Sequence, residues 1–233
     1  MSKPDIGNRK TAAGASGAWQ PRVLAGSIVV AVLLLGGCGL LGKKKAATIY
    51  APDPRVQADP AWPSVQWQLS VSRPSSPRML DSHRIAVRPV PGELQVYKGA
   101  NWAKPPADQV EDMVLRVLED SGRIPAVARQ GSGIAADYKL VMDLRRFEAD
   151  YAGASVPAAT IDVSVKLLHA PDHDVVDART FVQAVPADGT HAAQVSQAFE
   201  QALGRIGHDI AGWTLITGQA HERMGPHPVS SKR

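Results

Sequence analysis

Two stretches decide the fold of this 233-residue chain: Tyr138-Lys-Leu-Val-Met-Asp-Leu-Arg145 and Ile161-Asp-Val-Ser-Val-Lys-Leu167. Both place large apolar residues at every second position, the period of a half-buried strand. The alternation breaks at Arg146-Phe147, where we expect a bulge or a strand end. Pro171-Asp172 marks a turn, and Val175 to Val185 is predicted to return as the partner strand. Together these segments predict an antiparallel meander with one face open to water.

Two main helices are expected beside these strands. The first begins at Pro105-Pro106, because proline fits the first helical turn, and ends at Gly122. Its apolar stripe consists of Val110, Val114, Val117 and Leu118. The second runs from about Thr190 to Ile216, with apolar residues at steps of three or four. Glycines would weaken this helix in isolation, so close packing against the strands is predicted at Gly204, Gly207 and Gly212.

The rest of the chain predicts short strands and irregular segments. Strands are expected at Thr48–Ala51, Trp67–Val71, Arg84–Val90, Glu93–Tyr97 and Ile124–Ala128. The proline-rich stretch 52–63 is predicted to cross the fold as an irregular segment without helix or strand. The polar residues 217–233 are predicted to form a flexible tail. The fold class is therefore α/β. We expect a single-domain sandwich over residues 48–216, with a mixed, mostly antiparallel sheet and two main helices.

Composition and charge exclude several classes of protein. Hydrophobic residues make up 44% and charged residues 21%, which is near the average for a globular domain. A single cysteine excludes a disulfide scaffold and a multi-cysteine zinc module. Much of the formal charge of +4 lies before residue 38, where Lys3, Arg9, Lys10 and Arg22 oppose Asp5. The remainder has almost no net charge, so no nucleic-acid partner is expected.

The first 37 residues have the layout of a secretory signal. A basic stretch ends at Arg22, and the apolar run Val23–Leu35 is shorter than the roughly 20 residues of a membrane-spanning helix. Leu35-Gly-Gly-Cys38 resembles the bacterial lipobox, which predicts a signal peptide over 1–37 and lipidation of Cys38. The alternative is a buried free cysteine at the end of a short apolar helix. Residues 38–47 would form the lipidated N-terminus and tether.

The residue after the cysteine bears on localisation. In bacterial lipoproteins an Asp at this position favours retention in the inner membrane, and this chain has Gly39. We therefore expect an anchor in the outer membrane, with the folded body on the periplasmic face.

One cluster is a candidate for catalysis or metal binding: His169-Ala-Pro-Asp172-His173-Asp174. Pro171 prevents a helix that would place both imidazoles on one face, so a solvated turn is predicted, with a metal-dependent hydrolase as the alternative. The sequence has no Gly-x-Ser-x-Gly motif, and lipidation would consume the single thiol. We expect no catalytic residue, no metal and no cofactor.

Two aromatic residues are candidates for partner binding. Tyr97 and Trp102 flank the predicted loop Gly99-Ala100-Asn101, where exposed aromatic side chains would anchor a protein partner. The alternative for Trp102 is packing on the rim of the sheet, where it would cap the first helix.

An ordered set of segments resembles the ABC-type transport auxiliary lipoprotein family, which includes the PqiC-like lipoproteins of Gram-negative bacteria. The set is Arg84-Ile-Ala-Val-Arg-Pro-Val90, Pro91-Gly92, Leu94-Gln-Val-Tyr97, Asn101-Trp102 and the helix from Pro105 to Leu118. With the lipobox and the C-terminal helix, the resemblance covers about residues 38–216. The proline-rich insertion at 52–63 and the long basic N-terminal region depart from the family pattern.

This resemblance implies a fold similar to anticodon-binding-like domains and a non-enzymatic role. Such lipoproteins are thought to dock MCE-domain periplasmic proteins of ABC transport systems at the outer membrane during intermembrane lipid transport. The alternative is a periplasmic lipid carrier, with acyl chains in an apolar groove between the long helix and the sheet. The expected partners are the outer membrane, an MCE-domain protein and possible further copies of the chain.

Overall fold

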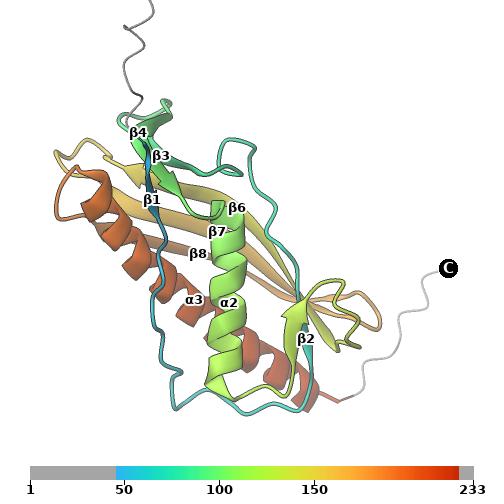
Figure 1. The fold of residues 1–233 in the computed structure, drawn as a ribbon. Coiled ribbons are helices and arrows are strands. Elements are labelled where there is room, and N and C mark those ends of the chain that lie inside the picture. Colours follow the sequence, from blue (N-terminus) through green and yellow to red (C-terminus); the bar gives the residue numbers. More distant parts are fainter. Residues whose placement is uncertain (1–45, 226–233) are drawn as a thin grey trace, which may run out of the picture. The chain divides into compact units, whose positions relative to one another are not determined.

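The computed structural model describes residues 46–225, whose strands form one eight-stranded sheet. Its strands are β1 (Thr48–Tyr50), β2 (Leu69–Val71), β3 (Arg84–Arg88), β4 (Gln95–Trp102), β5 (Val127–Arg129), β6 (Tyr138–Asp150), β7 (Ala158–His169) and β8 (Val175–Pro186). Its helices are α2 (Pro106–Ser121) and α3 (Ala192–Arg223). Figure 1 shows both helices in front of the long strands. The predicted α/β class with two main helices is confirmed.

The long strands form the predicted meander. β6 pairs with β7, and β7 with β8, both antiparallel. The register between β6 and β7 shifts between Leu144 and Arg146, which confirms a bulge where the alternation breaks.

The shorter strands make the sheet more mixed than predicted. β1–β4, β2–β5, β2–β6 and β3–β6 are parallel pairs, whereas β3–β4 is antiparallel. The expectation of a mostly antiparallel sheet therefore holds for the meander and for the β3–β4 pair, and not for the other four pairs. The sequence could not show this, because alternation identifies a strand without identifying its neighbour. The result is a curled, mixed sheet that resembles a half-barrel, and similarity to anticodon-binding-like domains stays a prediction.

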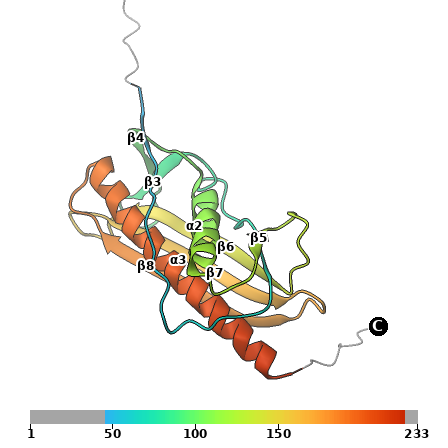
Figure 2. The same cartoon turned by 60° about the horizontal axis from the view of Figure 1, so that its bottom comes forward.

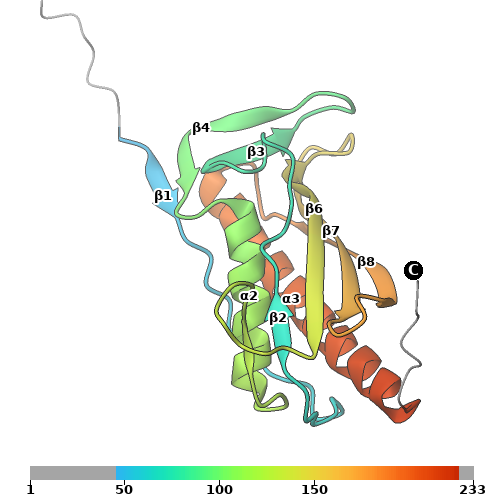
Figure 3. The ribbon, with the colours of Figure 1, turned by 90° about the vertical axis from the view of Figure 1, so that its right-hand side faces the viewer.

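α2 and α3 cover one face of this sheet. In β6, Tyr138, Leu140, Met142 and Leu144 are at most 1% exposed. They pack with α3 residues such as Phe199, Ile206 and Ile210, which are fully buried. Figure 3 shows the β3–β4 hairpin beyond the ends of the helices, while α2 and α3 lie beside the long strands. The core is thus a single layer between the helices and the sheet.

The ends of α2 agree with the sequence. Pro106 opens the helix and Gly122 ends it in the left-handed conformation, with φ of 60° and its N–H bonded to the Glu119 carbonyl.

The end of α3 corrects the predicted tail. Residues Thr217–Arg223 continue the helix, so the expectation of a flexible tail from Thr217 is wrong for this part. The Tyr138 hydroxyl donates to Glu222 Oε1 at 2.7 Å and lies 2.7 Å from His221 Nδ1. These contacts hold the last turn of α3 against β6. The polarity of residues 217–223 alone could not indicate them, because Tyr138 is distant in the sequence.

On the face away from the helices, an ion cluster joins β3 to β6. Glu148 is 2% exposed and accepts hydrogen bonds from Nε and Nη2 of Arg88, at 2.8 and 3.0 Å. Arg146 donates to the same carboxylate at 2.7 Å and also contacts Asp150. The hydrogen bonds that Arg88 donates to Glu148 raise the pKa of Arg88, so its guanidinium remains charged. Bidentate pairing of this kind fixes the register of the two parallel strands.

Candidate functional site

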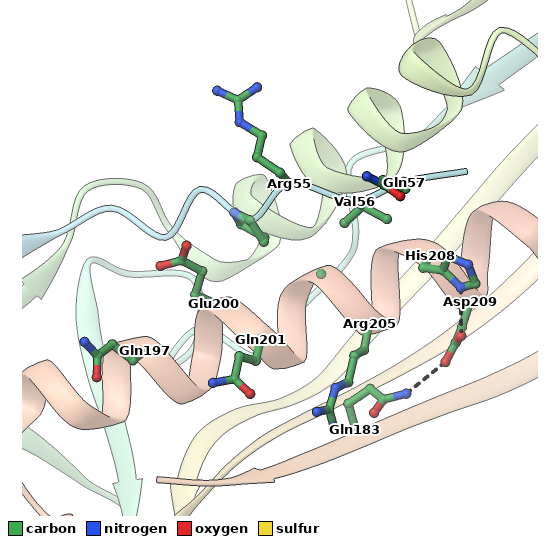
Figure 4. A pocket seen from close by; sticks show the side chains of 12 residues that line it. Arg55, Val56, Gln57, Gln183, Gln197, Glu200, Gln201, Arg205, His208 and Asp209 are labelled. Carbon is green, nitrogen blue, oxygen red and sulfur yellow. Dashed lines mark hydrogen bonds and ion pairs between the residues drawn. The ribbon is translucent and has the colours of Figure 1, made fainter. Parts of the chain in front are cut away.

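A groove lies between α3, β8 and the segment 51–63, which we call the strap. The strap crosses α3 in Figures 1 and 2 without forming a helix or strand. The groove has a volume of about 900 Å³. Its lining is mostly polar: Arg55, Gln57, Gln183, Gln197, Glu200, Gln201, Arg205, His208 and Asp209. Pro54, Val56 and Gly204 complete it. Figure 4 shows the strap residues opposite the side chains of α3.

Glycines of α3 allow the strap to approach the helix closely. A Cβ atom at Gly204 would lie 3.2 Å from Pro54 Cβ, and one at Gly212 would lie 2.5 Å from Trp62 Nε1. Such distances would force the strap or the helix to move. The glycines predicted to pack against strands therefore pack here against the strap, and Gly207 packs against Met113 of α2.

An ion pair also holds the strap to α2. Arg116 of α2 donates to Asp53, and this hydrogen bond lowers the pKa of the Asp53 carboxyl below its ordinary value. The strap is thus fixed to α2 by an ion pair and to α3 by close packing.

The groove is equipped to form hydrogen bonds. Gln183 Nε2 donates to Asp209 Oδ2 at 2.8 Å, and His208 Nδ1 lies 3.3 Å from Asp209 Oδ1. The two arginines and two carboxylates of the lining balance in formal charge. In Figure 4, Arg205 extends toward Gln183 of β8. These groups suit recognition of an uncharged polar ligand or chain.

The structure buries Trp102. Its side chain is 1% exposed and packs edge-on against Phe147 and Phe199, with ring centroids 5.9 and 5.2 Å away. The predicted loop at Gly99–Asn101 is part of β4, distorted where Gly99 adopts a φ of 68°. This burial contradicts an exposed anchor at Trp102. The side chain lies in the core between β6 and α3, deeper than the alternative of packing on the rim of the sheet to cap the first helix.

Tyr97 is half-buried and packs against the edge of the core. Burial raises the pKa of its hydroxyl, which therefore stays protonated at physiological pH. The structure does not bring Tyr97 and Trp102 together as one exposed patch. A role for Tyr97 in binding a partner stays a prediction.

The histidine cluster at residues 169–174 forms the predicted turn. The His173 N–H donates to the His169 carbonyl at 3.0 Å, and His169 Nδ1 lies 2.9 Å from Asp172 Oδ2. The backbone hydrogen bond from Asp174, together with His169, lowers the pKa of Asp172. Within residues 46–225, no group of three or more His, Cys, Asp or Glu side chains is placed to hold a metal ion.

His169 lies against α3. Its ring is 5.2 Å from that of His221 and 5.5 Å from that of Tyr138. His221 lies in α3 and not in the predicted tail, and the cluster that it forms with His169 and Tyr138 was not predicted from the sequence. The only sequence feature that indicates a longer helix is that apolar residues continue for a few positions after Trp213.

Cys38 lies outside the described residues, as do the predicted signal peptide and most of the tether. Among the helices that the structure describes, none has the length and apolar character needed to cross a bilayer.

The groove itself was not predicted from the sequence. Its polar residues come from three separate segments of the chain. The sequence of each segment by itself is typical of a solvent-exposed surface. Two glycines eight positions apart in α3, Gly204 and Gly212, were the available signal that another segment crosses the helix.

Comparison with known proteins identifies the family of the chain. The model of the ABC-type transport auxiliary lipoprotein component family matches residues 48–211. A crystal structure of a Xanthomonas campestris protein, assigned to the family DUF330, is 58% identical to the chain with a TM-score of 0.74. The match covers 76% of this chain and 99% of that protein.

Two further proteins are less similar to the chain. A crystal structure of an uncharacterised protein is 15% identical with a TM-score of 0.52, covers 68% of this chain and 97% of that one, and shows similarity of fold alone. An uncharacterised protein of Bradyrhizobium diazoefficiens is 26% identical over 157 residues, which is 67% of this chain. The chain spans 42% of the length of that relative. Because the family model extends from β1 to the middle of α3, the chain belongs to the ABC-type transport auxiliary lipoprotein components.

Proposed function

We propose that the chain is a lipid-anchored adaptor that docks an MCE-domain periplasmic protein of an ABC transport system at the outer membrane. The observation that carries the proposal is the family match over residues 48–211, which begins ten residues after the predicted lipidation site at Cys38. The described fold begins at Ala46, so seven residues separate Cys38 from it. Such a link spans at most about 30 Å, which would keep the folded body near its membrane.

The described residues favour binding over catalysis. Family membership implies an auxiliary transport component, and the groove at α3 offers amides, guanidinium groups and carboxylates at the surface. A surface of this kind suits a protein partner that binds through many modest hydrogen bonds.

The lipid-carrier alternative gains no support from the groove. Acyl chains need an apolar lining, whereas most of the groove residues are polar. The side chains between α3 and the meander already pack as a closed core, with Ile161, Val163 and Phe199 fully buried.

A binding titration with purified components tests the adaptor. The full chain, purified from membranes in mild detergent, is titrated with the MCE-domain periplasmic protein of the same cell, and binding is measured by interferometry. The proposal predicts saturable binding with a dissociation constant of about 10 μM or tighter, equivalent to about −7 kcal/mol. Lack of binding at tenfold higher concentration would contradict it.

A lipid readout on the same preparation tests the carrier. Lipid extraction followed by mass spectrometry measures any lipid bound beyond the covalent anchor, and reconstitution measures its effect on thermal stability. A stoichiometric lipid whose removal lowers the melting temperature would support the carrier reading instead.

A further inference from the structure

β8 is the long open edge of the sheet. Within the described residues it pairs only with β7, while the other terminal strands in the sheet order, β1 and β5, have three residues each. β8 extends over twelve residues, and Val175 and Val182 on it are 56% and 55% exposed. A long exposed edge is a template for pairing with another strand.

The register shows which backbone groups this edge offers. The Ala187 N–H donates to the Pro157 carbonyl at 2.9 Å, and the same register holds along β8 from Pro186 back to Asp177. Because hydrogen-bonded pairs alternate in an antiparallel ladder, Phe181, Gln183 and Val185 bond to β7. The N–H and carbonyl groups of the residues between them therefore point outward, at Ala178, Thr180, Val182 and Ala184.

The central part of this edge lacks the usual protection against pairing. Natural edge strands carry lysine, proline or inward-pointing charges that discourage an added strand. From Thr180 to Val185 the sequence is Thr-Phe-Val-Gln-Ala-Val, with no charge, and the first proline is Pro186.

α3 holds the edge strand in place. Trp213 Nε1 donates to Asp177 Oδ2 at 3.3 Å, and the Trp213 ring packs against Phe181 with centroids 5.8 Å apart. Gln183 is bonded to Asp209. The strand is therefore presented on a rigid support, which lowers the entropic cost of adding a partner to it.

The polar groove lies beside this edge on the helix side. Gln183 belongs to both, and Gln201 and Arg205 of α3 line the same groove. A strand added to β8 would alternate its side chains between the groove and the outer face. The balanced charge of the groove suits uncharged polar side chains, and the small or apolar row of Ala178, Val182 and Ala184 suits β-branched ones.

We propose that β8 and the adjoining groove bind an extended segment of a partner protein as an added strand, in which uncharged polar residues alternate with β-branched apolar ones. Main-chain hydrogen bonds to Thr180 and Val182 would supply affinity, and the groove would select the side chains. The inference rests on the proposed function only for the identity of the partner.

A peptide titration tests strand addition directly. The probe is a fluorescent twelve-residue peptide in which Val or Thr alternates with Asn or Ser, with a lysine at each end for solubility. Its twin carries N-methyl groups on alternate amides, which removes the donors that an added strand needs. Both are titrated by anisotropy against the full chain in detergent, and against Val182→Pro and Val182→Thr.

The proposal predicts saturable binding of the unmodified peptide by the native chain and by Val182→Thr. Binding should weaken at least about tenfold for the N-methylated twin and for Val182→Pro, which loses one outward N–H while keeping the bonds to β7. Circular dichroism verifies the fold, and Thr180→Pro replaces Val182→Pro if the latter fails to fold. Equal binding of both peptides, undiminished binding by the folded proline variant, or no saturable binding would overturn the proposal.

The two proposals can fail separately. If the peptide binds as expected but the MCE-domain protein does not, strand addition stands and the partner assignment falls. If the MCE-domain protein binds equally well to the native chain and to folded Val182→Pro, the partner assignment stands and β8 is not its docking edge.

Discussion

Among single residues, Trp102 is a candidate for partner binding in the sequence, yet its side chain lies in the core of the structure. Its ring contacts Phe147 and Phe199 in an edge-on arrangement. Trp102→Ala should therefore lower the free energy of unfolding by about 3–5 kcal/mol in denaturant titration. The conservative variant Trp102→Phe should retain full partner binding. Loss of binding by Trp102→Phe with unchanged stability would restore the anchor hypothesis.

Glu111 in α2 is a second residue whose environment can be tested. It is 6% exposed, and burial raises the pKa of its carboxyl above the ordinary 4.5, although Arg129 lies 3.6 Å away. A raised pKa in the folded state means that stability falls as pH rises from 4.5 through the folded value. Glu111→Gln should therefore be more stable than the native chain at pH 7.

The pH dependence identifies the cause. Below pH 4.5 the carboxyl is protonated in both the folded and unfolded states, so the advantage of Glu111→Gln should disappear in thermal melts. Glu119→Gln removes the same charge from an exposed position of the same helix and serves as the control. A benefit from Glu111→Gln that is equal at pH 4 and pH 7 would argue against a buried charge as its source.

At the scale of elements, close packing of the strap on α3 depends on glycine. Gly212→Ala would bring a Cβ within 2.5 Å of Trp62 Nε1, so we expect it to lower the unfolding free energy by about 1–3 kcal/mol. Helix propensity alone predicts the opposite, a gain of about 1 kcal/mol. In a Trp62→Leu background the loss should shrink, and a double-mutant cycle measures this coupling. Additive effects would show that the strap does not press on this glycine.

The elements also show how far the sequence leads. The alternation at Tyr138–Leu144 and Ile161–Leu167 predicts the meander, and Pro106 and Gly122 predict the ends of α2. Parallel pairing of the short strands could not be predicted, because it depends on contacts between distant segments. The last turn of α3 could not be predicted for the same reason, because it is held by Tyr138, which lies 83 residues away from His221 in the sequence.

At the scale of the whole molecule, the polar groove combines the strap, β8 and α3. The two glycines of α3 indicate that a segment crosses the helix, but no local pattern identifies the polar groups that meet there. The sequence did supply the family, through an ordered set of segments from Arg84 to Leu118, and the family match confirms it. It could not supply the open edge of β8, because an edge strand is identified only once the strand order is known.

The most direct test of the central claim is an affinity pull-down from cross-linked cell envelopes with the tagged full-length chain, followed by mass spectrometry. Cys38→Ser, which would prevent lipidation, is the matched control. If the chain is a lipid-anchored adaptor, an MCE-domain protein or its transporter should be recovered with the native chain from the outer-membrane fraction, and this recovery should fall sharply with Cys38→Ser. Recovery of neither from a chain that is present in that fraction would contradict the account.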